Sequence, residues 1–216
     1  MIIKSKPLPV ILIKFALFFL ALFLRPRFNK MVIKGVDIKP RHSYLLMCNH
    51  FSFLDGFFSL YLCFKAIDKR QPVKRVYIMS VKKQMQKKPW LKYFGSFSVD
   101  PGKRSVNESL EFAAEKLSEP GNILFYYPQG NLESSHIRHI VFQDGVYEII
   151  TRIKGNCQLL WSSNITEYFE STKPSVYFDM LDCGTNHQFD FEALKLKVNQ
   201  HHLRSLKSHV RFTKEC

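Results

Sequence analysis

The chain has 216 residues, of which 46% are hydrophobic and 14% aromatic, and it carries 32 Lys and Arg against 18 Asp and Glu. This composition is too apolar for a disordered chain, and the length favours one domain with appended elements over two full domains. The formal charge of +14 requires an anionic partner, which leaves nucleic acid, a membrane surface, phosphate groups or an acidic protein.

The positive charge is concentrated in the first part of the chain. Residues 1–100 hold 19 basic and 4 acidic residues, a net charge of +15, whereas residues 101–216 hold 13 and 14, a net charge of −1. A nucleic-acid-binding protein and a membrane protein anchored at its N-terminus would both show this asymmetry.

Residues 8–24 form an apolar segment of 17 residues whose one charged residue is Lys14. Seventeen residues are near the lower limit for a helix that spans a membrane, and the basic residues on both sides also suit a helix that lies in, or dips into, an anionic leaflet. A buried core helix is one alternative, and a secretory signal is another, although Arg25 and Pro26 stand where small residues should mark cleavage. We therefore expect residues 1–30 to associate with the cytoplasmic face of a membrane (the inner membrane in a bacterium) and residues 31–216 to form one domain.

Short apolar runs alternate with helical periodicities along that domain. Strands are expected at residues 44–48, 73–81, 95–99, 123–127, 157–162 and 176–181, with a short strand pair at residues 31–38. Helices are expected at residues 57–64, 105–117, 145–153 and 191–210, the last with Leu194, Val198, Leu203 and Leu206 facing inward. This alternation predicts an α/β fold, a single domain with a central mixed sheet flanked by helices.

Asn49 and His50 directly follow the expected strand at residues 44–48, and Asp55 comes five residues after His50. In open α/β sheets, ligands bind at the carboxyl ends of the strands. A neutral imidazole can take a proton from a hydroxyl, and a carboxylate on its other nitrogen fixes the tautomer and stabilises the imidazolium. A packed histidine beside an aspartate that caps a helix would give the same spacing, so the pair alone leaves both interpretations open.

Asn49-His50-x4-Asp55 resembles the first motif of the glycerolipid acyltransferases, the family of 1-acylglycerol-3-phosphate acyltransferases. Residues 95–100 (Gly-Ser-Phe-Ser-Val-Asp) resemble the second block, and residues 127–130 (Tyr-Pro-Gln-Gly) resemble the third, which is normally Phe-Pro-Glu-Gly followed by Thr-Arg-Ser. Val81-Lys82-Lys83, followed by Pro89, resembles the lysine-bearing approach to the second block. The resemblance runs from about residue 31 to about residue 165.

The resemblance implies a membrane-associated enzyme that moves a fatty acyl group from acyl-CoA or acyl carrier protein to a hydroxyl of a lysophospholipid or related lipid. His50 would remove the proton from the acceptor while Asp55 holds Nδ1–H, without an acyl-enzyme. The candidate substrate-binding residues adjoin this pair or lie in and after the later blocks: Asn49, Lys82, Lys83, Arg104, Gln129, Gly130 and Arg138. The lysines could instead form a solvated cationic face, and Pro128 and Gly130 could simply shape a turn.

The sequence also departs from the family pattern. Pro101 stands where the second block usually has Arg, although Lys103 and Arg104 follow. Gln129 replaces the usual Glu, and residues 131–133 (Asn-Leu-Glu) replace Thr-Arg-Ser, which removes an expected phosphate-binding Arg. These departures admit acceptors other than lysophosphatidate, including a hydroxyl or amine in a specialised lipid or pigment pathway.

Neither a bound cofactor nor a metal ion is expected. The five cysteines are scattered without a CxxC pair, which is typical of free thiols in a reducing compartment. Two histidine pairs, His136 with His139 and His201 with His202, have no further ligands nearby in the sequence. Since no nucleic-acid-binding motif is present, nucleic acid is not an expected partner. A non-catalytic membrane-binding relative is the remaining alternative to an enzyme.

Overall fold

The computed structural model describes residues 2–169 and 171–209, which are organised around one seven-stranded mixed sheet of order β1-β7-β6-β2-β5-β3-β4. The strands are β1 (Met31–Lys34), β2 (Ser43–Cys48), β3 (Arg75–Val81), β4 (Ser96–Val99), β5 (Asn122–Tyr126), β6 (Cys157–Glu167) and β7 (Ser175–Thr185). Neighbouring strands are parallel except β6 and β7, which are antiparallel. The predicted α/β domain with a mixed sheet is therefore confirmed.

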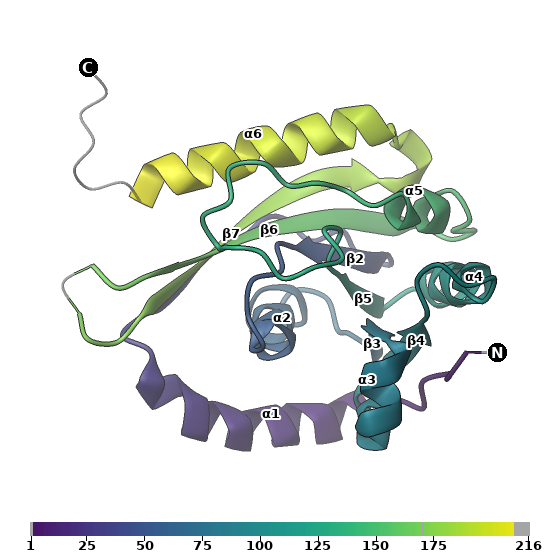
Figure 1. Cartoon of the computed structure of the whole chain (residues 1–216), viewed down its shortest axis with the longest axis horizontal. Helices are drawn as coiled ribbons and strands as arrows, with labels where there is room; N and C mark the ends of the chain where they lie inside the picture. Colours follow the sequence, from purple (N-terminus) through teal and green to yellow (C-terminus); the bar gives the residue numbers. More distant parts are fainter. Residues whose placement is uncertain (1, 170, 210–216) are drawn as a thin grey trace.

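Helices cover both faces of the sheet (Figure 1). The face with α1 (Val10–Leu24) also carries α2 (Asp55–Leu62), which continues as a π-helical turn at Cys63–Ile67. The opposite face carries α4 (Val106–Leu117), α5 (Gly145–Ile150) and α6 (Phe191–His209). The short helix α3 (Lys82–Lys87) and a 3₁₀ segment at Pro89–Phe94 connect β3 to β4 and carry Lys82 and Lys83.

Strand β2 shows why a continuous apolar run lies at the centre of the sheet. Tyr44 and Leu46 pack into the core beneath α1 and α2, whereas Leu45 and Met47 pack into the core beneath α4 to α6. Every residue of β2 is buried because alternate side chains enter opposite cores. The strand therefore places its carboxyl end between two packed layers, directly before the partly exposed His50.

The predicted strand pair at residues 31–38 is not formed. Only β1 forms, and it pairs in parallel with β7, from Met31 opposite Val176 to Lys34 opposite Asp179. Strands β6 and β7 are also longer than predicted because their antiparallel pairing extends from Gln158 opposite Thr185 to Glu167 opposite Ser175. These differences arise from pairing partners far away in the sequence, which a local pattern does not contain.

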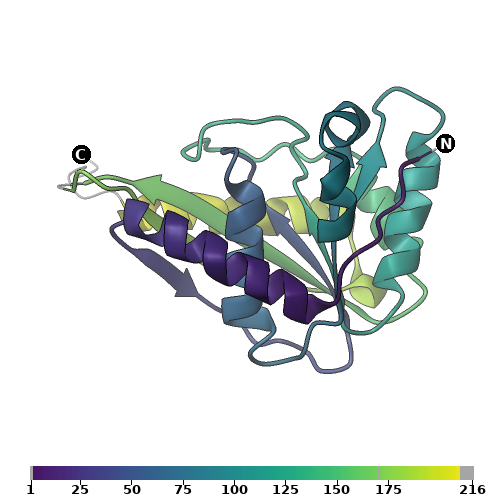
Figure 2. The same ribbon diagram turned by 90° about the horizontal axis from the view of Figure 1, so that it is seen from below.

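Helix α1 lies across α2 on the outside of the sheet (Figure 2). Ile13, Leu17 and Leu24 are buried against the domain, at the spacing of one helix face. Lys14 lies on this same inner side, where its ammonium is 2.6 Å from Asp68 and stands over the Phe64 ring. Within the described residues, no helix is both long and apolar enough to cross a membrane.

The inner face of α6 differs from the predicted one. Leu194 and Val198 are buried as expected, but Leu203 is exposed and His202 is buried in its place. His202 Nε2 is 2.8 Å from the Ile137 carbonyl oxygen, and its Nδ1 is 3.0 Å from the Ser163 hydroxyl. Burial lowers the pKa of His202 to about 4, so the ring is neutral and both nitrogens are used in packing α6 on the sheet. The predicted helix end at Val210 lies outside the described residues.

Candidate active site

The candidate site lies where β2 and β5 end side by side. After β2 the chain passes through α2 to β3, which lies on the β5 side of β2. After β5 it passes through α5 to β6, which lies on the opposite side of β2. Such a change in direction opens a crevice at the carboxyl ends of adjacent parallel strands. His50 follows β2 and Tyr127 follows β5, so two segments 77 residues apart meet at the carboxyl ends of these strands.

His50 and Asp55 form the predicted pair. His50 Nδ1 lies 2.6 Å from Asp55 Oδ2, and the same oxygen accepts backbone hydrogen bonds from Phe51 at 2.8 Å and Ser52 at 2.9 Å. The Asp55 side chain is 1% exposed, while that of His50 is 28% exposed. Asp55 also begins α2, where the helix dipole favours a negative charge.

The protonation pattern of the pair follows from these contacts. Asp55 Oδ2 accepts hydrogen bonds from the amides of Phe51 and Ser52, and its contact with His50 Nδ1 places the proton of a neutral ring on that nitrogen. Within the described part of the chain, His50 Nε2 has no hydrogen-bond partner. The ring therefore presents an unprotonated nitrogen toward solvent, as a general base must.

Tyr127 holds the plane of the His50 ring, and sequence reasoning assigned it no role. The two rings stack with centroids 4.5 Å apart and an angle of 23° between their planes. The Tyr127 hydroxyl is 2.9 Å from that of Ser59, and burial raises the pKa of Tyr127 well above its usual range. The signals for these residues were a Tyr at the start of the third block and a Ser one helical turn after Asp55.

Asn49, a predicted substrate-binding residue, is buried and bonded at both ends of its amide. Its Nδ2 donates to the Asn164 carbonyl at 2.9 Å, and its Oδ1 accepts from the Asn164 amide at 2.7 Å. These two hydrogen bonds fix the end of β2 against β6, directly before His50. The structure thus gives Asn49 a positioning role, with both of its polar groups engaged by backbone.

Gln129 likewise positions His50 from the third block. Its side chain is buried, and Oε1 accepts a hydrogen bond from the His50 amide at 2.8 Å. Its Nε2 donates to Glu133, whose own amide donates to the His50 carbonyl at 2.8 Å. Glu133 was not among the predicted site residues, although it occupies one of the positions that depart from the family pattern.

Gly130 ends a tight turn between β5 and the loop that follows. Its amide donates to the Tyr127 carbonyl at 3.2 Å, and its φ of +73° lies in the left-handed region that favours glycine. The interpretation of Pro128 and Gly130 as turn residues therefore has direct structural support. A contact between Gly130 and a substrate remains a prediction.

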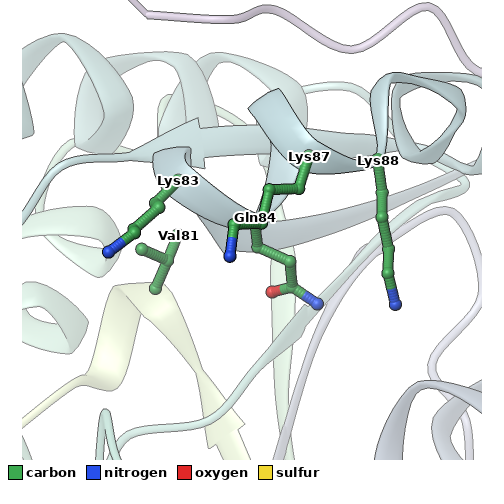
Figure 3. Close-up of a pocket in the computed structure, with 5 residues that line it drawn as sticks. All are labelled: Val81, Lys83, Gln84, Lys87 and Lys88. Atoms are coloured by element: carbon green, nitrogen blue, oxygen red, sulfur yellow. The ribbon is translucent and has the colours of Figure 1, made fainter.

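The predicted lysines lie on α3, beside the loop that carries His50. Lys88 Nζ stands 5.1 Å from the centre of the Phe53 ring, which is 81% exposed. An open pocket of about 310 Å³ is lined by Val81, Lys83, Gln84, Lys87 and Lys88, whose side chains extend to the same side of the helix (Figure 3). Lys82 Nζ lies 4.0 Å from Asp100 in the second block.

The two predicted arginines stay apart from the cluster. Arg104 is exposed in the turn before α4, and Arg138 is exposed in the loop that follows the third block. Within the described residues, neither is joined to His50, Asp55 or Gln129 by a hydrogen bond or an ion pair. His136 pairs with Glu167 at 2.7 Å. Among the described residues there is no group of three or more side chains able to hold a metal ion.

Comparisons with known proteins agree with this architecture. A family model described as Acyltransferase matches residues 30–160. The crystal structure of the 1-acyl-sn-glycerophosphate (LPA) acyltransferase PlsC from Thermotoga maritima has the same fold, with a TM-score of 0.60 and 15% sequence identity over 93% of this chain and 83% of PlsC. No curated protein is significantly similar in sequence. Because the family model spans more than half of its residues, the chain belongs to the acyltransferase family and is an acyltransferase enzyme.

Proposed function

We propose that this acyltransferase moves a fatty acyl group from an acyl thioester to a hydroxyl of a lysophospholipid or related lipid, with His50 as general base. The observation that carries the proposal is the 2.6 Å contact between His50 Nδ1 and Asp55 Oδ2. Similarity to PlsC, a 1-acyl-sn-glycerophosphate acyltransferase, supports an acceptor of the lysophospholipid kind.

The proposed step needs no covalent enzyme intermediate. His50 Nε2 takes the proton of the acceptor hydroxyl, and the oxygen attacks the thioester carbonyl carbon. The C–S bond then breaks, the new ester forms, and the imidazolium returns its proton to the thiolate of the departing donor. Asp55 stabilises the imidazolium in between, because its buried carboxylate is already bonded to Nδ1.

The substrate groups are assigned to different sides of His50. Lys82, Lys83 and Arg104 would contact the phosphate groups of the donor, which is acyl-CoA or acyl carrier protein, and the exposed lysines of α3 favour such an anionic partner. Gln129, Gly130 and Arg138 would line the acceptor side, with Asn49 holding the loop in place. The chemistry of the proposed step requires no bound cofactor or metal.

Helix α1 supports a location at the cytoplasmic surface of a membrane. Its outward side exposes eight large apolar side chains: Ile11, Leu12, Phe15, Phe18, Phe19, Leu20, Leu22 and Phe23. The single charge within the helix, on Lys14, is turned inward to Asp68, so the outward side is uninterrupted. A continuous apolar surface followed by Arg25 and Arg27 suits a helix that lies flat in an anionic leaflet.

Replacing Phe15 and Phe19 together by glutamate is expected to weaken binding to anionic vesicles by about tenfold or more, since both rings are exposed and each would leave the acyl region of the leaflet. Co-sedimentation with vesicles of phosphatidylcholine and phosphatidylglycerol measures this binding. Leu196→Glu, an equally exposed apolar position on α6, is the matched control and should sediment like the wild type. Equal sedimentation of the double variant and the wild type would exclude α1 as the docking helix.

The activity itself is tested with the purified full chain, lipid extract and labelled acyl-CoA or acyl carrier protein. The expected result is a labelled diacyl lipid, identified by mass spectrometry, together with release of the free donor thiol. If neither donor yields an acylated product with any lipid of the extract, the proposed reaction is wrong, and a non-catalytic membrane-binding role takes its place.

A further inference from the structure

The loop after the third block fixes a carboxylate beside the proposed base. Glu133 donates its amide to the His50 carbonyl at 2.8 Å, and its side chain accepts a hydrogen bond from Gln129 Nε2. Gln129 Oε1 in turn accepts from the His50 amide at 2.8 Å. These three bonds join Glu133 to both the amide and the carbonyl of His50, so the carboxylate has a defined place next to the reacting centre.

The Glu133 carboxylate has no ion-pair partner in the part of the chain that the structure describes. Glu167, in contrast, pairs with His136 at 2.7 Å. The Glu133 side chain is only partly buried, so its charge can act on a ligand bound at His50.

Arg138 follows Glu133 closely in the sequence, but the residues on either side of Arg138 are hydrogen-bonded to α6. The carbonyl of Ile137 accepts a bond from His202, and Ile140 exchanges two hydrogen bonds with the side chain of Asn199. The loop thus turns away from His50 toward α6 between Glu133 and Arg138. The nearest downstream arginine is therefore not held against the carboxylate of Glu133.

The loop that carries His50 also contacts the basic helix α3. Lys88 stands over Phe53, and Lys83 and Lys87 line the pocket on α3 (Figure 3). Phosphate groups of the donor are attracted to these lysines. A phosphate monoester on the acceptor carries nearly two negative charges at neutral pH, and Glu133 would repel it where the acceptor hydroxyl reaches His50.

We propose that Glu133 makes this enzyme select a lipid acceptor whose headgroup carries no phosphate monoester and no net negative charge, such as a zwitterionic or neutral monoacyl lipid. This inference rests on the proposed acyl transfer and specifies its acceptor. An ammonium headgroup is attracted to the carboxylate and a neutral hydroxyl headgroup is not repelled, whereas lysophosphatidate is disfavoured in both binding and turnover.

The test compares kcat/KM for lysophosphatidylethanolamine and lysophosphatidate, presented in the same detergent micelles with the same donor. The wild type is expected to prefer the zwitterionic acceptor, and Glu133→Gln should shift the ratio toward lysophosphatidate by about fivefold. Glu192→Gln, which removes a carboxylate from exposed α6, should leave the ratio unchanged. Leu132→Arg places a cation at a position that is 60% exposed and should shift the ratio in the same direction as Glu133→Gln.

The outcomes separate this inference from the proposed function. If the wild type acylates lysophosphatidate best, or if Glu133→Gln lowers the rates with both acceptors equally, selection by Glu133 is wrong and acyl transfer still stands. An unchanged ratio in both Glu133→Gln and Leu132→Arg would also overturn the inference. If no acceptor is acylated by the wild type, the proposed function itself has failed.

Discussion

His50→Ala is expected to lower the rate of acyl transfer by about 100-fold to 10,000-fold, the contribution of a well-placed general base. The variant removes the one nitrogen that faces solvent beside the bonded pair, so no group remains to take the acceptor proton. The rate is measured as labelled diacyl product formed per enzyme under saturating donor and acceptor.

The fold of the variant is checked at the same time, because the His50 ring also stacks on Tyr127. Thermal unfolding and co-sedimentation with anionic vesicles should stay close to those of the wild type, since the exposed apolar side chains of α1 are unchanged. His187→Ala is the matched control: this exposed histidine contacts Asn156 and lies outside the site, so transfer should continue at the wild-type rate. Undiminished transfer by folded His50→Ala protein would remove the general-base assignment.

Asp55→Asn is expected to lower the rate of transfer by about 100-fold or more, because it keeps an oxygen for the three donors but removes the charge that stabilises the imidazolium. It should also lower the free energy of unfolding by about 1–3 kcal/mol. The new amide would point to the place of Asp55 Oδ1, which is buried and has no hydrogen-bond partner. Chemical unfolding and the transfer assay measure the two effects.

Asp55→Ala separates the contribution of Asp55 to stability from its contribution to the rate of transfer. It leaves the amides of Phe51 and Ser52 without their acceptor, so the loss of stability should exceed that of Asp55→Asn and reach about 3 kcal/mol. Asp37→Asn, at a fully exposed carboxylate, is the control and should change neither quantity. Equal rates for Asp55→Asn and the wild type would mean that Asp55 only shapes the turn into α2.

Local patterns predicted the elements that surround the site. The apolar run at residues 44–48 corresponds to β2, and the helical periodicity at residues 105–117 corresponds to α4. Both predictions are confirmed because a strand buried on two faces is a continuous apolar run, and a helix buried on one face repeats apolar residues at its own period. The short spacing between His50 and Asp55 is local in the same way, since a strand end and the next helix start bring them together.

Local patterns failed where a distant partner decides the outcome. Leu203 was expected inside because of its spacing, yet α6 buries His202, whose two nitrogens find Ser163 and Ile137 across the fold. In the sequence, Lys14 interrupts the apolar segment at residues 8–24. In the structure, Lys14 forms an ion pair with Asp68, so this lysine is accommodated on the inner side of α1. Burying a polar side chain is unfavourable unless such a hydrogen-bond or ion-pair partner is present.

The sequence by itself determined the α/β class, because its apolar runs and helical periodicities are local patterns. The proposed base, its carboxylate and the lysines before the second block were predicted from short motifs that resemble those of the acyltransferases. Only the tertiary structure decided that Asn49 and Gln129 position His50, that Tyr127 stacks on it, and that Glu133 lies beside it. These contacts join β2 to residues about 80 to 115 positions away, and such contacts form only when parallel strands align their carboxyl ends.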